Sequence, residues 1–68
     1  MKIRVNGEER EFGELQTVAD LLREMQIDPA QGGIAVAVNQ DVVTRARLSE
    51  APVRDGDRVE IVHAVQGG

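Results

Sequence analysis

The sequence of 68 residues contains no cysteine, so the fold has no disulfide bond or thiolate zinc site to stabilise it, and no thiol can act as a nucleophile. Phe12 is the only aromatic residue, which leaves no platform on which nucleic acid bases could stack. Positive charge is also scarce, because twelve acidic side chains outnumber eight basic ones and give a net charge of −4. Such a chain repels the phosphate backbone, and we expect no nucleic acid partner.

Long apolar runs are missing as well. None approaches the ~20 residues that a membrane-spanning helix needs, and residues 1–4 alternate between apolar and basic where a signal peptide would be apolar throughout. We therefore expect no membrane partner and a cytoplasmic location. A chain of this length is near the lower limit for a domain that folds alone, so we expect one domain.

Candidate catalytic groups are few. His63 is the only histidine and Ser49 the only serine, and no nucleophile-elbow pattern surrounds Ser49. Asp55 and Asp57 flank a glycine as turn residues do, whereas a calcium loop needs more oxygen ligands at defined spacing. The sequence therefore predicts a protein that is not an enzyme on its own, with no catalytic residue and no bound metal or cofactor.

The first half of the chain predicts a hairpin followed by a helix. Residues 1–5 alternate between apolar and charged, which is typical of a strand with one covered face, and Asn6-Gly7 favours a tight hairpin turn. The return strand, residues 8–12, is mostly charged and suits a sheet edge, with Phe12 as its core contact. The residue pair Thr17 and Asp20 predicts a capping box that opens a helix.

That helix carries apolar residues at positions i, i+3, i+4 and i+7, namely Val18, Leu21, Leu22 and Met25. We expect it to end at Asp28-Pro29, because the residue before a proline is pushed out of the α region. Further extended segments follow at residues 34–38 and around 42–43, with a turn at Asn39-Gln40-Asp41 between them. A last strand is expected at residues 58–63, where Val59 and Ile61 point inward, and residues 48–53 are irregular, with a helical turn.

This order of elements predicts an α+β fold of the β-grasp, or ubiquitin-like, class. In it, one helix packs across one face of a mixed four- to five-stranded sheet, and the first and last strands lie side by side and parallel at its centre. We expect a folded domain over residues 1–63 and a flexible C-terminal tail over residues 64–68, which ends in Gly-Gly.

The tail is the most informative segment. Glycines 67 and 68 lack side chains, so they can pass through a channel that a β-carbon would block. Fully extended, the five residues after His63 reach about 16–18 Å. We expect Val65, Gln66 and Gly67 to thread into a partner protein and to present the α-carboxylate of Gly68 there.

Several segments, in this order and at this length, resemble the ThiS family, the bacterial sulfur carrier proteins of thiamine biosynthesis. They are Val5-Asn6-Gly7, residues 17–22, residues 36–39, Val43-Thr44-Arg45, residues 55–62 and Gln66-Gly67-Gly68. The resemblance implies that a partner adenylyltransferase of the ThiF type, similar to ubiquitin-activating enzymes, uses ATP and magnesium to adenylate Gly68. A sulfur donor enzyme would then convert this group to a thiocarboxylate, and thiazole synthase (ThiG type) would receive the sulfur for the thiazole ring.

A docking surface is expected on the sheet face away from the helix. Ala35, Ala37 and Val62 should form an apolar patch there, bordered by arginines such as Arg4 and Arg58.

Three alternatives stay open at this stage. The small subunit of molybdopterin synthase shares the fold and the glycine pair, although its tail usually follows a stretch rich in proline or phenylalanine. A ubiquitin-like protein modifier has the same terminus and forms an isopeptide. A purely structural β-grasp module is the third alternative.

Overall fold

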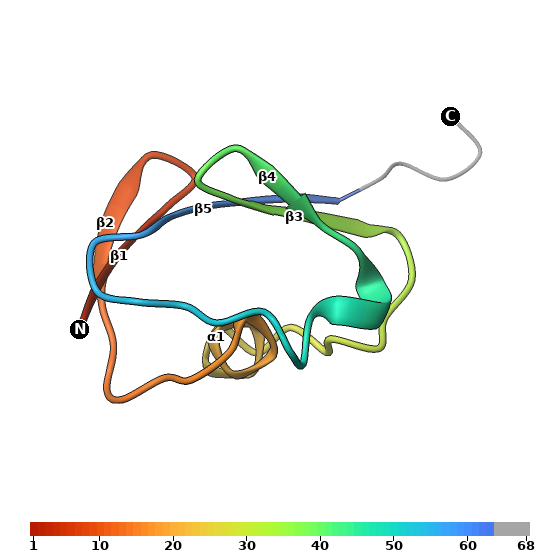
Figure 1. The fold of residues 1–68 in the computed structure, drawn as a ribbon, viewed down its shortest axis with the longest axis horizontal. Coiled ribbons are helices and arrows are strands. Elements are labelled where there is room, and N and C mark those ends of the chain that lie inside the picture. The colour runs from red at the N-terminus through yellow and green to blue at the C-terminus, as the bar shows by residue number, and fades with distance from the viewer. Residues whose placement is uncertain (64–68) are drawn as a thin grey trace.

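The computed structural model describes residues 1–63; residues 64–68, where a flexible tail is expected, lie outside the described part. The elements are β1 (Lys2–Val5), β2 (Glu8–Glu11), α1 (Val18–Glu24), β3 (Ile34–Val38), β4 (Asp41–Val43), the 3₁₀ turn η1 (Arg45–Arg47) and β5 (Arg58–His63). Across residues 1–63 the strands form one five-stranded sheet in the order β2-β1-β5-β3-β4, with α1 on one face (Figure 1).

The first and last strands lie next to each other in this sheet. β1 and β5 run parallel, with Arg4 opposite Arg58 and Val5 opposite Val59, whereas the other neighbouring strands are antiparallel. This arrangement confirms the mixed sheet of the expected β-grasp fold. It places β5 in the middle of the sheet, with its final residues beside β3.

Two of the three antiparallel pairs are hairpins joined by tight turns. Asn6 and Gly7 join β1 to β2 with φ angles of 51° and 82°, and Asn39 and Gln40 join β3 to β4 with φ angles of 50° and 76°. A type I′ turn requires positive φ at both central residues, and its twist matches the twist of the strands it joins. Both predicted turns are therefore confirmed.

The core lies between α1 and the facing side of the sheet. Along β1 and β5, alternate residues point into the core, as predicted: Ile3, Val5, Val59 and Ile61. They pack beneath the apolar side of α1, whose buried residues are Val18, Ala19, Leu21 and Leu22. Phe12 is half-buried and packs against the core from the position just after β2. No polar side chain of the described residues is buried in this core.

The helix ends earlier than predicted, at Glu24 rather than at Asp28. Gln26 adopts a left-handed conformation with φ 63°, and its N–H donates to the carbonyl of Arg23 at 2.9 Å. The N–H of Ile27 donates to the carbonyl of Leu22 at 2.8 Å, which completes a Schellman motif, and Ile27 packs against the core. The helix therefore ends at this motif, which packs the half-buried Ile27 against the core, before the proline is reached.

The helical turn expected within residues 48–53 lies just before them, in η1. The irregular segment itself is held by the start of α1. Val18 and Ala19 donate their N–H groups to the carbonyls of Ala51 and Leu48 at 3.0 and 2.9 Å. Leu48 is buried beside the helix. The segment is thus fixed by helix N–H groups that would otherwise have no intrahelical partner.

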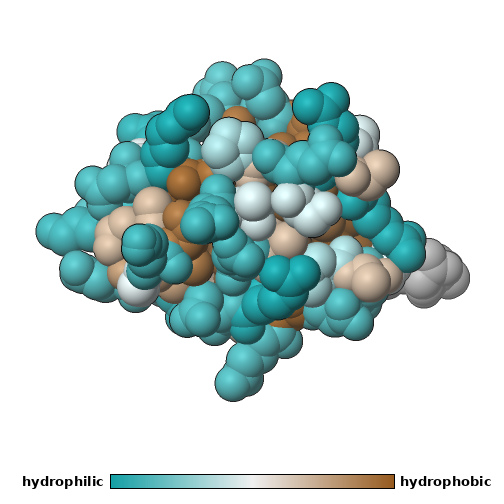
Figure 2. Space-filling view, turned by 60° about the horizontal axis from the view of Figure 1, so that its bottom comes forward, coloured by the Kyte–Doolittle hydropathy of each residue, from teal (hydrophilic) through white to brown (hydrophobic). Residues whose placement is uncertain are grey.

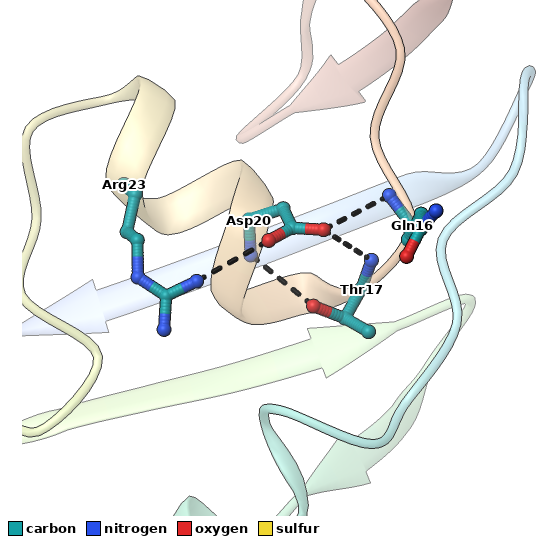
Figure 3. Close-up of polar contacts among 4 residues, drawn as sticks. All are labelled: Gln16, Thr17, Asp20 and Arg23. Carbon is teal, nitrogen blue, oxygen red and sulfur yellow. Dashed lines mark hydrogen bonds and ion pairs between the residues drawn. The ribbon is translucent and has the colours of Figure 1, made fainter.

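The predicted capping box is present at the start of α1 (Figure 3). The Thr17 hydroxyl accepts from the Asp20 N–H at 3.3 Å, and the Asp20 carboxylate accepts from the N–H groups of Gln16 and Thr17, each at 3.1 Å. Arg23 Nη1 lies 3.2 Å from the same carboxylate. The backbone hydrogen bonds from Gln16 and Thr17, with a smaller contribution from the Arg23 charge, hold the pKa of Asp20 below its ordinary value of 3.8.

This lowered pKa makes a pH-dependent contribution to stability. It is complete above the pKa of the unfolded chain, about pH 4, and is lost as the pH falls through the lower pKa of the folded chain. We expect Asp20→Asn to melt at a lower temperature than the wild type at pH 7, and the difference in Tm to close as the pH falls below about 4. Circular dichroism melts from neutral to acidic pH measure this difference.

Glu24→Gln removes one negative charge from the same helix and serves as the control for net charge. A Tm difference between Asp20→Asn and the wild type that stays constant across the acidic range would contradict the assignment.

Candidate functional site

The sheet has one free face, which we call the outer face: the side opposite α1. Alternation along the strands places Ala35 and Ala37 of β3 there, with Val62 of β5 directly opposite Ala35. Val42 of β4 lies opposite Ala37 on the other side of β3. Among residues 1–63, Val42 and Val62 are the exposed large hydrophobic residues, with 76% and 58% of their surfaces accessible. We call these four residues the apolar patch.

The structure thus brings the three predicted apolar docking residues together and adds Val42. The signal for Val42 was present in the sequence. A two-residue turn at Asn39-Gln40 pairs Val38 with Asp41, and hence Ala37 with Val42, on the same face of the sheet.

The arginines lie further from the patch than predicted. Arg58 is on the outer face, but at the beginning of β5, and Glu60 stands between it and Val62. At the rise of a strand, Arg58 and Val62 are about 13 Å apart. Arg4 lies opposite Arg58 on β1, and its Nη2 atom is 4.0 Å from Glu9 Oε1. The outer face therefore has an apolar half over β3, β4 and the end of β5, and a charged half over β1 and β2.

The apolar patch also differs from the side of the molecule on which α1 lies. That side is covered mainly by hydrophilic side chains, with smaller hydrophobic areas between them (Figure 2). Val42 and Val62 are the exposed large hydrophobic residues of the described part of the chain, and exposed apolar patches are typical of partner sites.

The predicted carrier residue Gly68 and the threading residues Val65, Gln66 and Gly67 lie outside the described residues. The strand that leads to them is β5. β5 ends at His63, opposite Ile34, and Val62 of the apolar patch directly precedes it. The patch is therefore at the end of the sheet from which the chain continues to the glycine pair.

The two candidate catalytic side chains named in the sequence are both at the surface. His63 is exposed at the end of β5, and Ser49 is exposed in the turn after η1. The described residues contain no cluster of three or more His, Cys, Asp or Glu side chains that could hold a metal ion. In the same part of the chain, α1 and η1 are both too short to cross a membrane.

Comparisons with known proteins agree with this architecture. The sequence profile of the ThiS family matches residues 3–68. The chain is 35% identical to the sulfur carrier protein ThiS of Escherichia coli over 68 residues, which is 100% of both proteins. It superimposes on the crystal structure of the thiamine biosynthesis protein ThiS from Geobacter metallireducens with a TM-score of 0.81 and 30% identity, and covers 100% of both chains.

A third relative is much longer. The chain is 40% identical over 68 residues to a thiazole synthase of Paramagnetospirillum magneticum, but it spans 20% of that protein. The fold and the full-length relatives define a ubiquitin-like sulfur carrier protein. The chain belongs to the ThiS family, which confirms the resemblance noted in its sequence.

Proposed function

We propose that this chain carries sulfur for the thiazole ring of thiamine as a thiocarboxylate on the α-carboxyl group of Gly68. The observation that carries the proposal is the full-length similarity to a sulfur carrier protein, which includes the glycine pair because the family profile extends to residue 68. These relatives favour sulfur transfer over the molybdopterin synthase subunit and the protein modifier that the sequence left open.

The chemistry proceeds in balanced steps. A carboxylate oxygen of Gly68 attacks the α-phosphorus of ATP, pyrophosphate leaves, and an acyl-adenylate forms. The terminal sulfur of a persulfide on the donor enzyme then attacks the carbonyl carbon and displaces AMP. A thiol finally cleaves the S–S bond to the donor, which forms a disulfide and leaves the thiocarboxylate on Gly68. In this scheme the partner enzymes hold ATP and Mg²⁺, and this chain contributes the acyl group rather than catalytic side chains.

The proposed partners are an activating adenylyltransferase of the ThiF type, a sulfur donor enzyme and a thiazole synthase of the ThiG type. The similarity to part of a thiazole synthase supports the last of these. A segment that is 40% identical to this whole chain makes up 20% of that synthase, so a carrier-like segment and a synthase occur there in one polypeptide.

The proposed docking surface is the apolar patch, with Arg58 and Arg4 at the far end of the outer face. A partner that covers Val62 holds the strand directly before the tail. From that point the five residues after His63 can reach about 16–18 Å into the partner's active site. The two arginines add charged contacts outside the apolar area, where they orient a partner more than they add affinity.

A mass measurement tests the carrier chemistry. With the cognate activating enzyme, ATP, Mg²⁺ and a sulfur donor, we expect the intact mass of the chain to rise by about 16 Da as sulfur replaces one carboxylate oxygen. Deletion of Gly68, or addition of one residue after it, should abolish the rise. Both variants should keep the wild-type Tm, because the buried core residues found among residues 1–63 lie between Ile3 and Ile61.

An unchanged wild-type mass with a demonstrably active enzyme would refute the carrier function. A mass gain that persists without Gly68 would place the acyl group elsewhere.

Substitution of Val62 tests the docking surface. Because Val62 is 58% exposed, Val62→Glu should leave the stability of the domain within about 0.5 kcal/mol of the wild type. It places a charge in the apolar patch, and we expect the Kd for the activating enzyme, measured by calorimetry, to rise about tenfold or more. Ala46→Glu adds the same charge at an exposed position of η1, away from the outer face, and is the matched control. Equal affinities for the two variants would remove the outer face from consideration.

A further inference from the structure

β5 continues beyond the point where its neighbour β1 ends. The parallel ladder pairs Arg4 with Arg58 and Val5 with Val59, and the chain then turns away at Asn6 and Gly7. On its other side β5 stays paired with β3 as far as His63. The last residues of β5 therefore have a neighbouring strand on the β3 side, while the turn lies on the β1 side.

The side chain of Asn6 takes the place of the missing strand. Its Oδ1 accepts from the Ile61 N–H at 2.8 Å, and its Nδ2 donates to the Ile61 carbonyl at 3.1 Å. The backbone N–H of Asn6 donates to the Val59 carbonyl at 2.9 Å, so side chain and backbone bond to alternate residues of β5. A carboxamide has the same donor and acceptor as a peptide group, which allows it to extend the ladder by one residue.

Ile61 lies seven residues before Gly68 in the chain. We propose that Asn6 is a positioning residue: by holding Ile61, it fixes the end of β5 and thereby the direction in which residues 64–68 approach the active site of a partner. This inference rests on the proposed function. It assigns to the first hairpin turn a part in the transfer reaction, beyond closing the hairpin.

The expected effect is on the reaction more than on docking. Three residues of the apolar patch, Ala35, Ala37 and Val42, lie on β3 and β4, whereas the side chain of Asn6 bonds to Ile61 of β5. The fourth, Val62, is paired with Ala35 of β3 on the side of β5 away from Asn6. The reaction depends on placing one carboxylate against bound ATP, and a small misplacement of a reacting group lowers the rate strongly. Without the Asn6 hydrogen bonds Ile61 is held less firmly, so the Gly68 carboxylate should sample more positions. The apolar patch should remain available, because Val62 stays paired with Ala35.

The second hairpin turn supplies a matched control. Asn39 has nearly the same conformation as Asn6, with φ 50° against 51°, and also occupies the first position of its turn. Its Oδ1 accepts from the Arg58 N–H at 3.0 Å, and its Nδ2 donates to Asp57 Oδ1 at 3.1 Å. Asn39 therefore holds the beginning of β5, whereas Asn6 holds its end.

The experiment compares Asn6→Gly with Asn39→Gly. Glycine accepts the positive φ at both sites, so each variant loses the carboxamide without added backbone strain. The measurement is the rate of the mass gain of about 16 Da with the activating enzyme, ATP, Mg²⁺ and the sulfur donor, over a range of carrier concentrations. For Asn6→Gly we expect kcat to fall about tenfold with KM within about twofold of the wild type, and for Asn39→Gly both constants within about twofold.

Amide hydrogen exchange provides a readout that does not depend on activity. Exchange at Ile61 should accelerate in Asn6→Gly, and exchange at Arg58 should accelerate in Asn39→Gly. Asn6→Asp keeps an acceptor for the Ile61 N–H but loses the donor to its carbonyl, so we expect an intermediate kcat. This variant tests the same point if Asn6→Gly does not fold.

A wild-type kcat in folded Asn6→Gly would overturn the inference, as would equal losses of kcat in the two glycine variants, because either result assigns Asn6 to stability alone. These results leave the proposed function intact, since the wild type still gains mass. A wild type that gains no mass would refute the proposed function, and this inference with it.

Discussion

The parallel pairing of β1 with β5 is the contact on which the rest of the structure depends. It joins the first strand to the last one, with Arg4 opposite Arg58 and Val5 opposite Val59. The pair buries Ile3, Val59 and Ile61 beneath α1 and makes β5 the central strand of the sheet. The chain therefore leaves the domain from a central strand, which β3 pairs with as far as His63 and which β1 pairs with as far as Val59.

One face of the sheet packs against the core, and the other is exposed. Alternation along β5 directs Val59 and Ile61 into the core and Arg58, Glu60 and Val62 to the outer face. Stability therefore comes from one face, while the other is free to bind partners without a cost to the core. This separation suits the proposed function, in which the chain presents one carboxyl group to partner enzymes in turn.

Asn6 and Asn39, the first central residues of the two tight turns, each shape a turn and also bond to the distant strand β5. Each asparagine adopts a positive φ that its turn needs, and each uses its carboxamide to hold β5. The turn conformation could be read from the dipeptides themselves. The partners of the carboxamides could not, because Ile61 is 55 residues from Asn6 and meets it only once β1 and β5 have paired.

The sequence by itself determined the features that depend on a few neighbouring residues: the two turns, the capping box of Thr17 and Asp20, and the inward side of β5. It also indicated the glycine pair, since the meaning of that pair depends on the absence of side chains. Tertiary structure decided the helix end, because α1 stops before Pro29 at a Schellman motif whose half-buried Ile27 packs against the core. It also assembled the apolar patch, because the pairing of β5 with β3 puts Val62 opposite Ala35. It also brought Asn6 to Ile61, because β1 and β5 pair only in the folded chain. Each of these outcomes depends on contacts between segments that only the folded chain brings together.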